Sequence, residues 1–234
     1  GTSATAATRP EIELVSSTSE GVTVRLIVPS FQIDWKEEHG RRFQIVSFPE
    51  CRFTTAPGEP RLPIQSTLVG IPTDVQVGLQ VIQADYTQKR VGKILPAARM
   101  AIRGVPTQIS TSPRGEDNVS GDLAFYQDAS IYKQNRFLPQ AVAEVGKPGF
   151  IRDVRVLRLQ FNPVQYNPVA ATVKLYHRLV VQIRFHPVPR APSNRQISIP
   201  SSTPRRESDT YEQIFQATLI NPYSAKRWRA PMPN

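Results

Sequence analysis

One cysteine and three histidines are the residues of this chain best suited to nucleophilic catalysis. A cysteine nucleophile needs a base or a cation beside it that favours the thiolate, so Cys51 would have to pair with His39, His177 or His186. Cys51 follows Glu50 in the sequence FPECRF, and a neighbouring negative charge raises a thiol pKa. The pattern therefore predicts an inert thiol, no catalytic residue, and a chain that is not an enzyme.

Metal and cofactor sites are not indicated either. Glu37, Glu38 and His39 are adjacent, but no third ligand stands at a useful spacing, which favours a solvated charged turn. His177 falls on the apolar face of an expected strand, where a packed histidine is more common than a ligand. The sequence has no glycine-rich phosphate loop, no paired-cysteine motif and no Gly-x-Ser-x-Gly elbow. We expect no metal and no cofactor.

Any functional residues must be positioned by β-strands, because alternation of apolar and polar side chains dominates the chain. The alternation predicts strands at 22–28, 75–81, 155–161 and 173–185, each with one apolar face. In the last of these, Lys174, Tyr176, Arg178, Gln182 and Arg184 are expected on the polar face. The 22 prolines argue against a helical bundle and favour strands joined by rigid turns. The sequence predicts an all-β fold, an antiparallel β-sandwich with one short C-terminal helix.

The chain divides into three predicted parts. Residues 1–187 form the sandwich, with 1–10 flexible, and 188–206 form a linker rich in proline and serine. Residues 207–234 contain the helix, marked by apolar residues at helical spacing, and then a basic tail. Within the sandwich, segment 103–121 is long for a connection between strands, and long loops are often binding loops.

The formal net charge of +10 raises the question of an acidic partner. Lys174, Arg178 and Arg184 could line a phosphate-binding face, but only Tyr176 lies among them, so a solvated sheet face is favoured. A glycan-binding or adhesion module of a secreted protein is the alternative from another class, although loop 103–121 has no aromatic residue. No run of 18 apolar residues predicts a membrane-spanning helix, and no oligomeric state is indicated.

Two segments, 58–72 (GEPRLPIQSTLVGIP) and 150–185, carry the most specific pattern. Together with the helix SDTYEQIF they resemble, in the same order, the N-terminal propeptide of gingipain-type cysteine peptidases over residues 43–230. The matching positions are Gly58, Pro60, Leu62 and Pro63, then Ile151, Arg152, Asp153, Val154 and Arg155, then Pro163, Gln165, Tyr166, Asn167 and Pro168.

This resemblance implies a jelly-roll-like sandwich that inhibits the zymogen and assists the folding of a cysteine peptidase. The implied partner is the cognate peptidase catalytic domain, and no nucleic acid or membrane span is expected. The resemblance also implies a bacterial protein that is secreted or held in the cell envelope, with its signal peptide already removed.

The resemblance further implies a site in the long loop. In related propeptides a basic residue seven positions after a strand-ending proline enters the specificity pocket, and counting from Pro96 gives Arg103, followed by Gly104. Arginine suits this role because its guanidinium can form two parallel hydrogen bonds to a carboxylate. Arg99 and Arg114 are the nearest competitors for the role.

A second implied site is the maturation cleavage, in the tail that follows the helix. Cleavage is expected after Arg227, with Arg229 and Lys226 as alternatives. We expect the tail to be exposed, as sites of limited proteolysis usually are.

Overall fold

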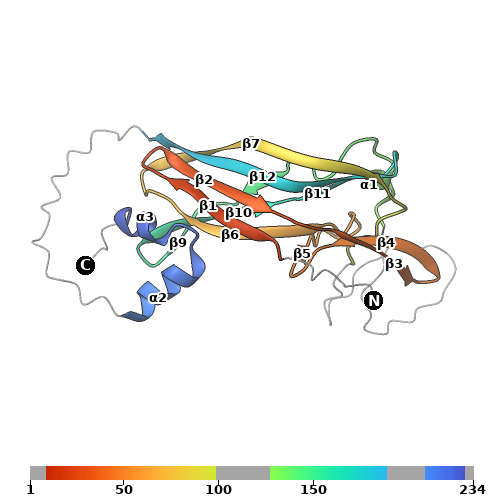
Figure 1. Ribbon diagram of the computed structural model, residues 1–234, viewed down its shortest axis with the longest axis horizontal. Helices are drawn as coiled ribbons and strands as arrows, with labels where there is room; N and C mark the ends of the chain where they lie inside the picture. Colours follow the sequence, from red (N-terminus) through yellow and green to blue (C-terminus); the bar gives the residue numbers. More distant parts are fainter. Residues whose placement is uncertain (1–8, 99–126, 189–208, 230–234) are drawn as a thin grey trace, which may run out of the picture.

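The alternating strands pair into two antiparallel sheets that stack face to face in the computed structural model (Figure 1). The structure describes residues 9–98, 127–188 and 209–229. The first sheet is built around the long strand β12, which pairs with β7 along one edge and with β2 and β11 along the other. Its strands are β1 (Glu11–Ser17), β2 (Gly21–Ile27), β7 (Val75–Arg90), β11 (Val164–Asn167) and β12 (Thr172–Pro187).

The second sheet is centred on β10, which pairs with β6 on one side and with β8 and β9 on the other. A separate hairpin of β3 and β4 extends from one end of the sandwich (Figure 1). The strands of the second sheet and the hairpin are β5 (Arg52–Phe53), β6 (Pro63–Gly70), β8 (Ala143–Val145), β9 (Gly149–Ile151), β10 (Val154–Phe161), β3 (Gln32–Glu38) and β4 (Arg41–Ser47).

The core lies between the two sheets and consists of the apolar faces that the alternation predicted. Val24 and Val181 of the first sheet and Leu159 and Phe161 of the second are fully buried in one hydrophobic cluster. Burial of each side chain of this size stabilises the fold by about 1.5–3 kcal/mol. The prediction of an all-β antiparallel sandwich is confirmed.

One detail of the predicted strand 173–185 is wrong. Tyr176 was expected on the polar face, but it is buried and its hydroxyl donates to Gln165 Oε1 (2.7 Å). The pairing of β12 with β7 shifts register between Tyr176 and Arg178, so His177 is an extra residue that the partner strand does not match. Such a β-bulge interrupts the alternation that sequence reasoning assumes.

The C-terminal helices cover the outer face of the second sheet. The predicted helix is α2 (Asp209–Thr218), and a second short helix, α3 (Pro222–Arg227), follows it. Phe215 of α2, Leu219 just after it and Ala225 of α3 pack with Val154 and Val156 in a separate hydrophobic cluster. The helices and α1 (Ala129–Tyr132) lie at opposite ends of the molecule (Figure 1). The boundaries of the predicted linker stay a prediction, because 189–208 lie outside the described residues.

Candidate functional site

The chain segments on both sides of the long connection between Ala98 and Gln127 are hydrogen-bonded to one residue, Gly58. The backbone N–H of Gly58 donates to the carbonyl oxygen of Ala97 (3.0 Å), and the carbonyl oxygen of Gly58 accepts from the N–H of Asp128 (3.0 Å). Gly58 is buried, so these hydrogen bonds are shielded from competing water. The two ends of the connection are therefore held beside each other. We call this arrangement the Gly58 clasp.

The clasp needs a glycine because of its backbone conformation. Gly58 has a φ of +81°, in the left-handed region that glycine enters without a steric penalty. The turn is supported by Thr54, whose hydroxyl donates to the carbonyl oxygen of Pro60 (3.0 Å) and accepts from the N–H of Leu62 (3.0 Å). The N–H of Ala97 also donates to the carbonyl oxygen of Glu59 (2.8 Å). The Gly-x-Pro-x-Leu-Pro segment thus forms the base of the connection.

Helix α1 braces the returning end. The hydroxyl of Tyr132 donates to the carbonyl oxygen of Ile94 (2.7 Å), which joins the chain after the connection to the chain before it. Burial raises the pKa of Tyr132, so this hydroxyl keeps its proton. Asp128 caps the helix, accepting from Ser130 N–H (2.8 Å) and from the Ser130 hydroxyl (2.6 Å). These hydrogen bonds lower the pKa of Asp128, and the one from the Ser130 side chain has the largest effect.

The Pro-x-Gln-Tyr-Asn-Pro segment has a structural role. The side-chain amide of Gln165 donates to the carbonyl oxygens of Pro139 (2.7 Å) and Gln140 (3.0 Å), while its oxygen accepts from Tyr176. Asn167 Oδ1 accepts from the N–H groups of the turn that leads into β12. All four residues of β11 are buried. This segment fixes the strand order beneath α1 and carries no exposed reactive group.

The residues predicted to enter a peptidase pocket cannot be placed. Arg103, Gly104, Arg99 and Arg114 lie between 99 and 126, outside the described residues. Pro96, from which Arg103 was counted, is described: it is buried and bridges Pro60 in the clasp. The roles predicted for the four loop residues therefore stay predictions.

The basic residues of the C-terminal segment are described, and their surroundings differ from expectation. Lys226 and Arg227 lie in the last turn of α3 rather than in an exposed tail. Lys226 Nζ and Arg229 Nη2 each form an ion pair with a carboxylate oxygen of Glu212, at 3.4 Å and 3.1 Å. The side chains of Lys226 and Arg227 are exposed, but the backbone of 222–227 is helical, because Pro222 begins α3. Cleavage after Lys226, Arg227 or Arg229 stays a prediction.

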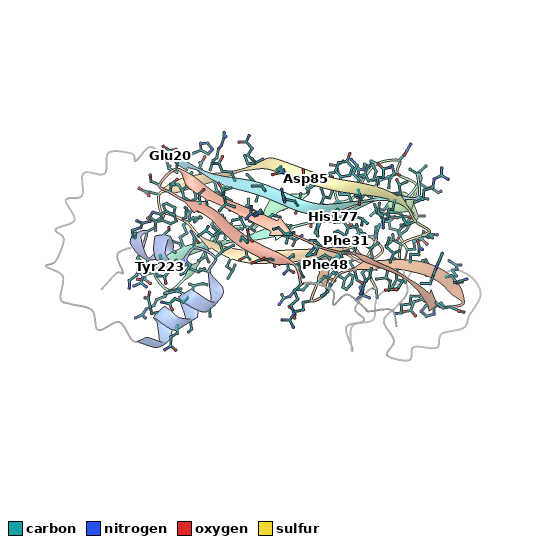
Figure 2. The ribbon with its side chains drawn as sticks, in the orientation of Figure 1. Glu20, Phe31, Phe48, Asp85, His177 and Tyr223 are labelled. Carbon is teal, nitrogen blue, oxygen red and sulfur yellow. The ribbon has the colours of Figure 1, made fainter. Side chains whose placement is uncertain are left out.

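Two of the residues considered for catalysis, His177 and Cys51, occupy structural positions, while His39 and His186 are exposed. Figure 2 shows His177 beside Phe31 and Phe48, and the ring centroids of His177 and Phe31 are 5.4 Å apart. The two ring nitrogens of His177 lie 3.0 Å from Thr87 Oγ1 and 3.3 Å from a backbone carbonyl oxygen. Burial is the main cause that raises the pKa of the Cys51 thiol. Within the described ranges, no three His, Cys, Asp or Glu side chains could hold a metal ion.

The basic face of β12 is occupied by local contacts. Lys174 Nζ lies over the rings of Tyr86 (4.7 Å) and Phe137 (4.4 Å), and Arg184 Nε donates to Gln182 Oε1 (3.0 Å). The expectation of a solvated sheet face, rather than a phosphate-binding one, stays a prediction. No helix in the described ranges is long and apolar enough to cross a membrane.

Sequence reasoning missed three sets of contacts that shape the candidate site. The double hydrogen bond of Gly58, the brace from Tyr132 and the paired contacts of Glu212 all join residues far apart in the chain. Only Gly58 had a signal in the sequence, as part of the matched Gly-x-Pro-x-Leu-Pro pattern. The fold and the site together define the class of protein. It is a β-sandwich in which the long connection between Ala98 and Gln127 is held at both ends by the Gly58 clasp.

Comparison with known proteins assigns the family. Residues 2–219 match the family model Propeptide_C25. The chain is 25% identical over 207 residues to gingipain R1 of Porphyromonas gingivalis, covering 88% of this chain and 19% of the relative. It is 25% identical over 182 residues to Lys-gingipain of the same organism, covering 76% of this chain and 10% of the relative. This chain belongs to the Propeptide_C25 family, the non-catalytic propeptides of gingipain-type cysteine peptidases.

Solved structures share the fold. A structure titled "Complex of Porphyromonas gingivalis RgpB pro- and mature domains" matches with a TM-score of 0.65 and 22% identity, covering 91% of this chain and 97% of the matched one. A second, on the zymogenic latency of gingipain K, matches with a TM-score of 0.60 and 20% identity, covering 78% and 96%. Because this chain spans less than a third of its curated relatives, the activity of a whole precursor is a matter for proposal.

Proposed function

We propose that this domain inhibits the cysteine peptidase of its own precursor and assists the folding of that peptidase. The observation that carries the proposal is the Gly58 clasp, in a chain that belongs to a propeptide family. Holding both ends of the connection lowers the conformational entropy that must be lost when it binds a partner. The catalytic domain of that peptidase is the proposed partner.

The inhibitory contact that we propose is Arg103 in the specificity pocket of the peptidase. Its guanidinium would form paired hydrogen bonds to a pocket carboxylate, each contributing about 1.5–3 kcal/mol. To remain uncut, the backbone at Arg103 and Gly104 must be misaligned for attack, since a small misplacement removes the proximity advantage. Glycine permits the unusual dihedrals that such a path requires.

Release of inhibition follows cleavage of the chain in the C-terminal segment, after Arg227 or, alternatively, after Arg229 or Lys226. We place the precursor in the bacterial cell envelope or outside the cell, after removal of a signal peptide. The proposed assistance to folding is tested separately, by the yield of active peptidase domain refolded with and without this domain.

The test of the inhibitory function compares the wild-type domain with Arg103→Ala against the cognate peptidase. We expect stoichiometric inhibition by the wild type and an inhibition constant at least about tenfold higher for Arg103→Ala, which corresponds to about 1.4 kcal/mol. Arg99→Ala and Arg114→Ala are matched controls and should change the constant by less than about twofold. A change of that small size for Arg103→Ala would remove Arg103 from the mechanism. Absence of inhibition by the wild type would overturn the proposed function itself.

A further inference from the structure

Two of the three basic residues proposed for maturation are held by one carboxylate. Glu212 of α2 pairs with both Lys226 and Arg229, although the three residues come from different parts of the C-terminal segment. The Arg229 side chain is only 19% exposed, and its guanidinium carbon lies 5.4 Å from the centroid of the Phe215 ring. Arg227 differs, because its side chain is exposed and its one hydrogen bond among the described contacts is a long one to Ser224 Oγ (3.4 Å).

The backbone around Arg227 is docked on the sandwich from both sides. Before it, the side chain of Asn221 accepts from the N–H of Gly70 (2.8 Å) and donates to the carbonyl oxygen of Gly70 (3.0 Å). Ala225 is buried so closely against Gly70 that a Cβ built on this glycine would lie 2.3 Å from the Ala225 Cβ. After it, the ring of Trp228 packs edge-on against Phe185, with centroids 5.5 Å apart.

A helical, docked segment is a poor protease substrate. Proteases act on exposed and locally unfolded chain, so cleavage of a structured segment depends on how often it opens. The Arg227–Trp228 bond lies between a helical turn and an aromatic ring that contacts the core. Cleavage after Arg227 therefore requires α3 to leave Gly70 and Trp228 to leave Phe185.

We propose that α3 is a latch that shields the maturation site, and that Glu212 sets how often it opens. This inference rests on the proposed function, because only a precursor has a maturation bond to protect. The opening step separates Lys226 and Arg229 from Glu212 and exposes 222–229 together. The latch lies at the end of the molecule opposite α1 and the base of the long connection, so the two can be altered independently (Figure 1).

The experiment measures the latch directly in the chain of residues 1–234. Amide hydrogen exchange is followed for 222–229, and the rate of trypsin cleavage after Arg227 is followed by mass spectrometry. Glu212→Gln keeps the size of the side chain and removes the charge. We expect about three- to tenfold faster exchange and cleavage, because two partly exposed ion pairs are lost. Glu37→Gln, an exposed carboxylate on β3, is the control for the loss of one negative charge and should leave both rates unchanged.

A second variant opens the latch without touching a charge. Gly70→Ala places a methyl group against Ala225, so it should raise both rates at least as much as Glu212→Gln does. Unchanged exchange in both variants, or equal acceleration by Glu37→Gln, would overturn the latch. Inhibition of the cognate peptidase by the domain is measured in a separate assay. Loss of inhibition with intact protection of 222–229 would refute the proposed function and leave the shielding in place.

Discussion

We predict that Gly58→Ala weakens inhibition of the cognate peptidase by more than its loss of folding stability can explain. An L-residue in the left-handed region costs about 1–2 kcal/mol, and the φ of +81° at Gly58 lies in that region. The turn can relieve this strain by rotating its peptide groups, which breaks the hydrogen bond to Ala97, the one from Asp128, or both. Each such bond contributes about 0.5–1.5 kcal/mol. The ends of the long connection are then no longer held together.

Two measurements separate the effects of this substitution. The melting temperature should fall by about 2–8 °C, since a domain of this size loses about 2–4 °C for each kcal/mol and the strain costs about 1–2 kcal/mol. The inhibition constant against the cognate peptidase should rise about tenfold at a temperature where the variant is fully folded, because the peptidase must then order a looser connection.

Gly40→Ala is the matched control for Gly58→Ala. Gly40 also has a positive φ, +67°, but it lies at the tip of the β3–β4 hairpin with nothing within 4 Å of an added Cβ. It should show a similar loss of stability and an unchanged inhibition constant. Equal inhibition by Gly58→Ala and the wild type would show that the clasp does not contribute to inhibition. An equal loss of inhibition in the two variants would show that the effect is only one of stability.

Further predictions concern buried polar groups. Gln165→Leu should lower the free energy of unfolding by about 1–3 kcal/mol in urea titration, because it leaves the Tyr176 hydroxyl and two carbonyl groups without their partner. Tyr132→Phe should cost about 1 kcal/mol by the same method and weaken inhibition, because it removes the hydrogen bond to Ile94; a change in neither would exclude the brace. Cys51 should react with iodoacetamide more slowly at pH 8 than free cysteine does, since a raised pKa leaves less thiolate; an equal rate would contradict its burial.

The strands were predictable because each buries one face, and burial imposes alternation on the sequence. Val24, Leu159 and Val181 are buried as the alternation required. Tyr176 was not predictable, because the bulge at His177 depends on the pairing with β7 rather than on local pattern. Helix α3 was not expected because proline breaks a helix that is already under way, but Pro222 stands in the first turn, where proline is well suited to begin one.

The candidate site was predictable only in part. The matched Gly-x-Pro-x-Leu-Pro pattern pointed to Gly58, but its two hydrogen bonds reach residues 39 and 70 positions further along the chain. Contacts of that range are decided by the packing of the whole sandwich. The contacts of Glu212 with Lys226 and Arg229 arise in the same way, since α2 and α3 must first dock on the second sheet.

The proposed function requires this domain to close the active site of its own peptidase. Steady-state inhibition by the wild-type domain, measured at several concentrations of a small substrate, tests it most directly. A domain that closes the active site should give inhibition that is competitive with the substrate and complete at one domain for each peptidase. Inhibition that is independent of substrate concentration, or no inhibition at any ratio, would contradict it.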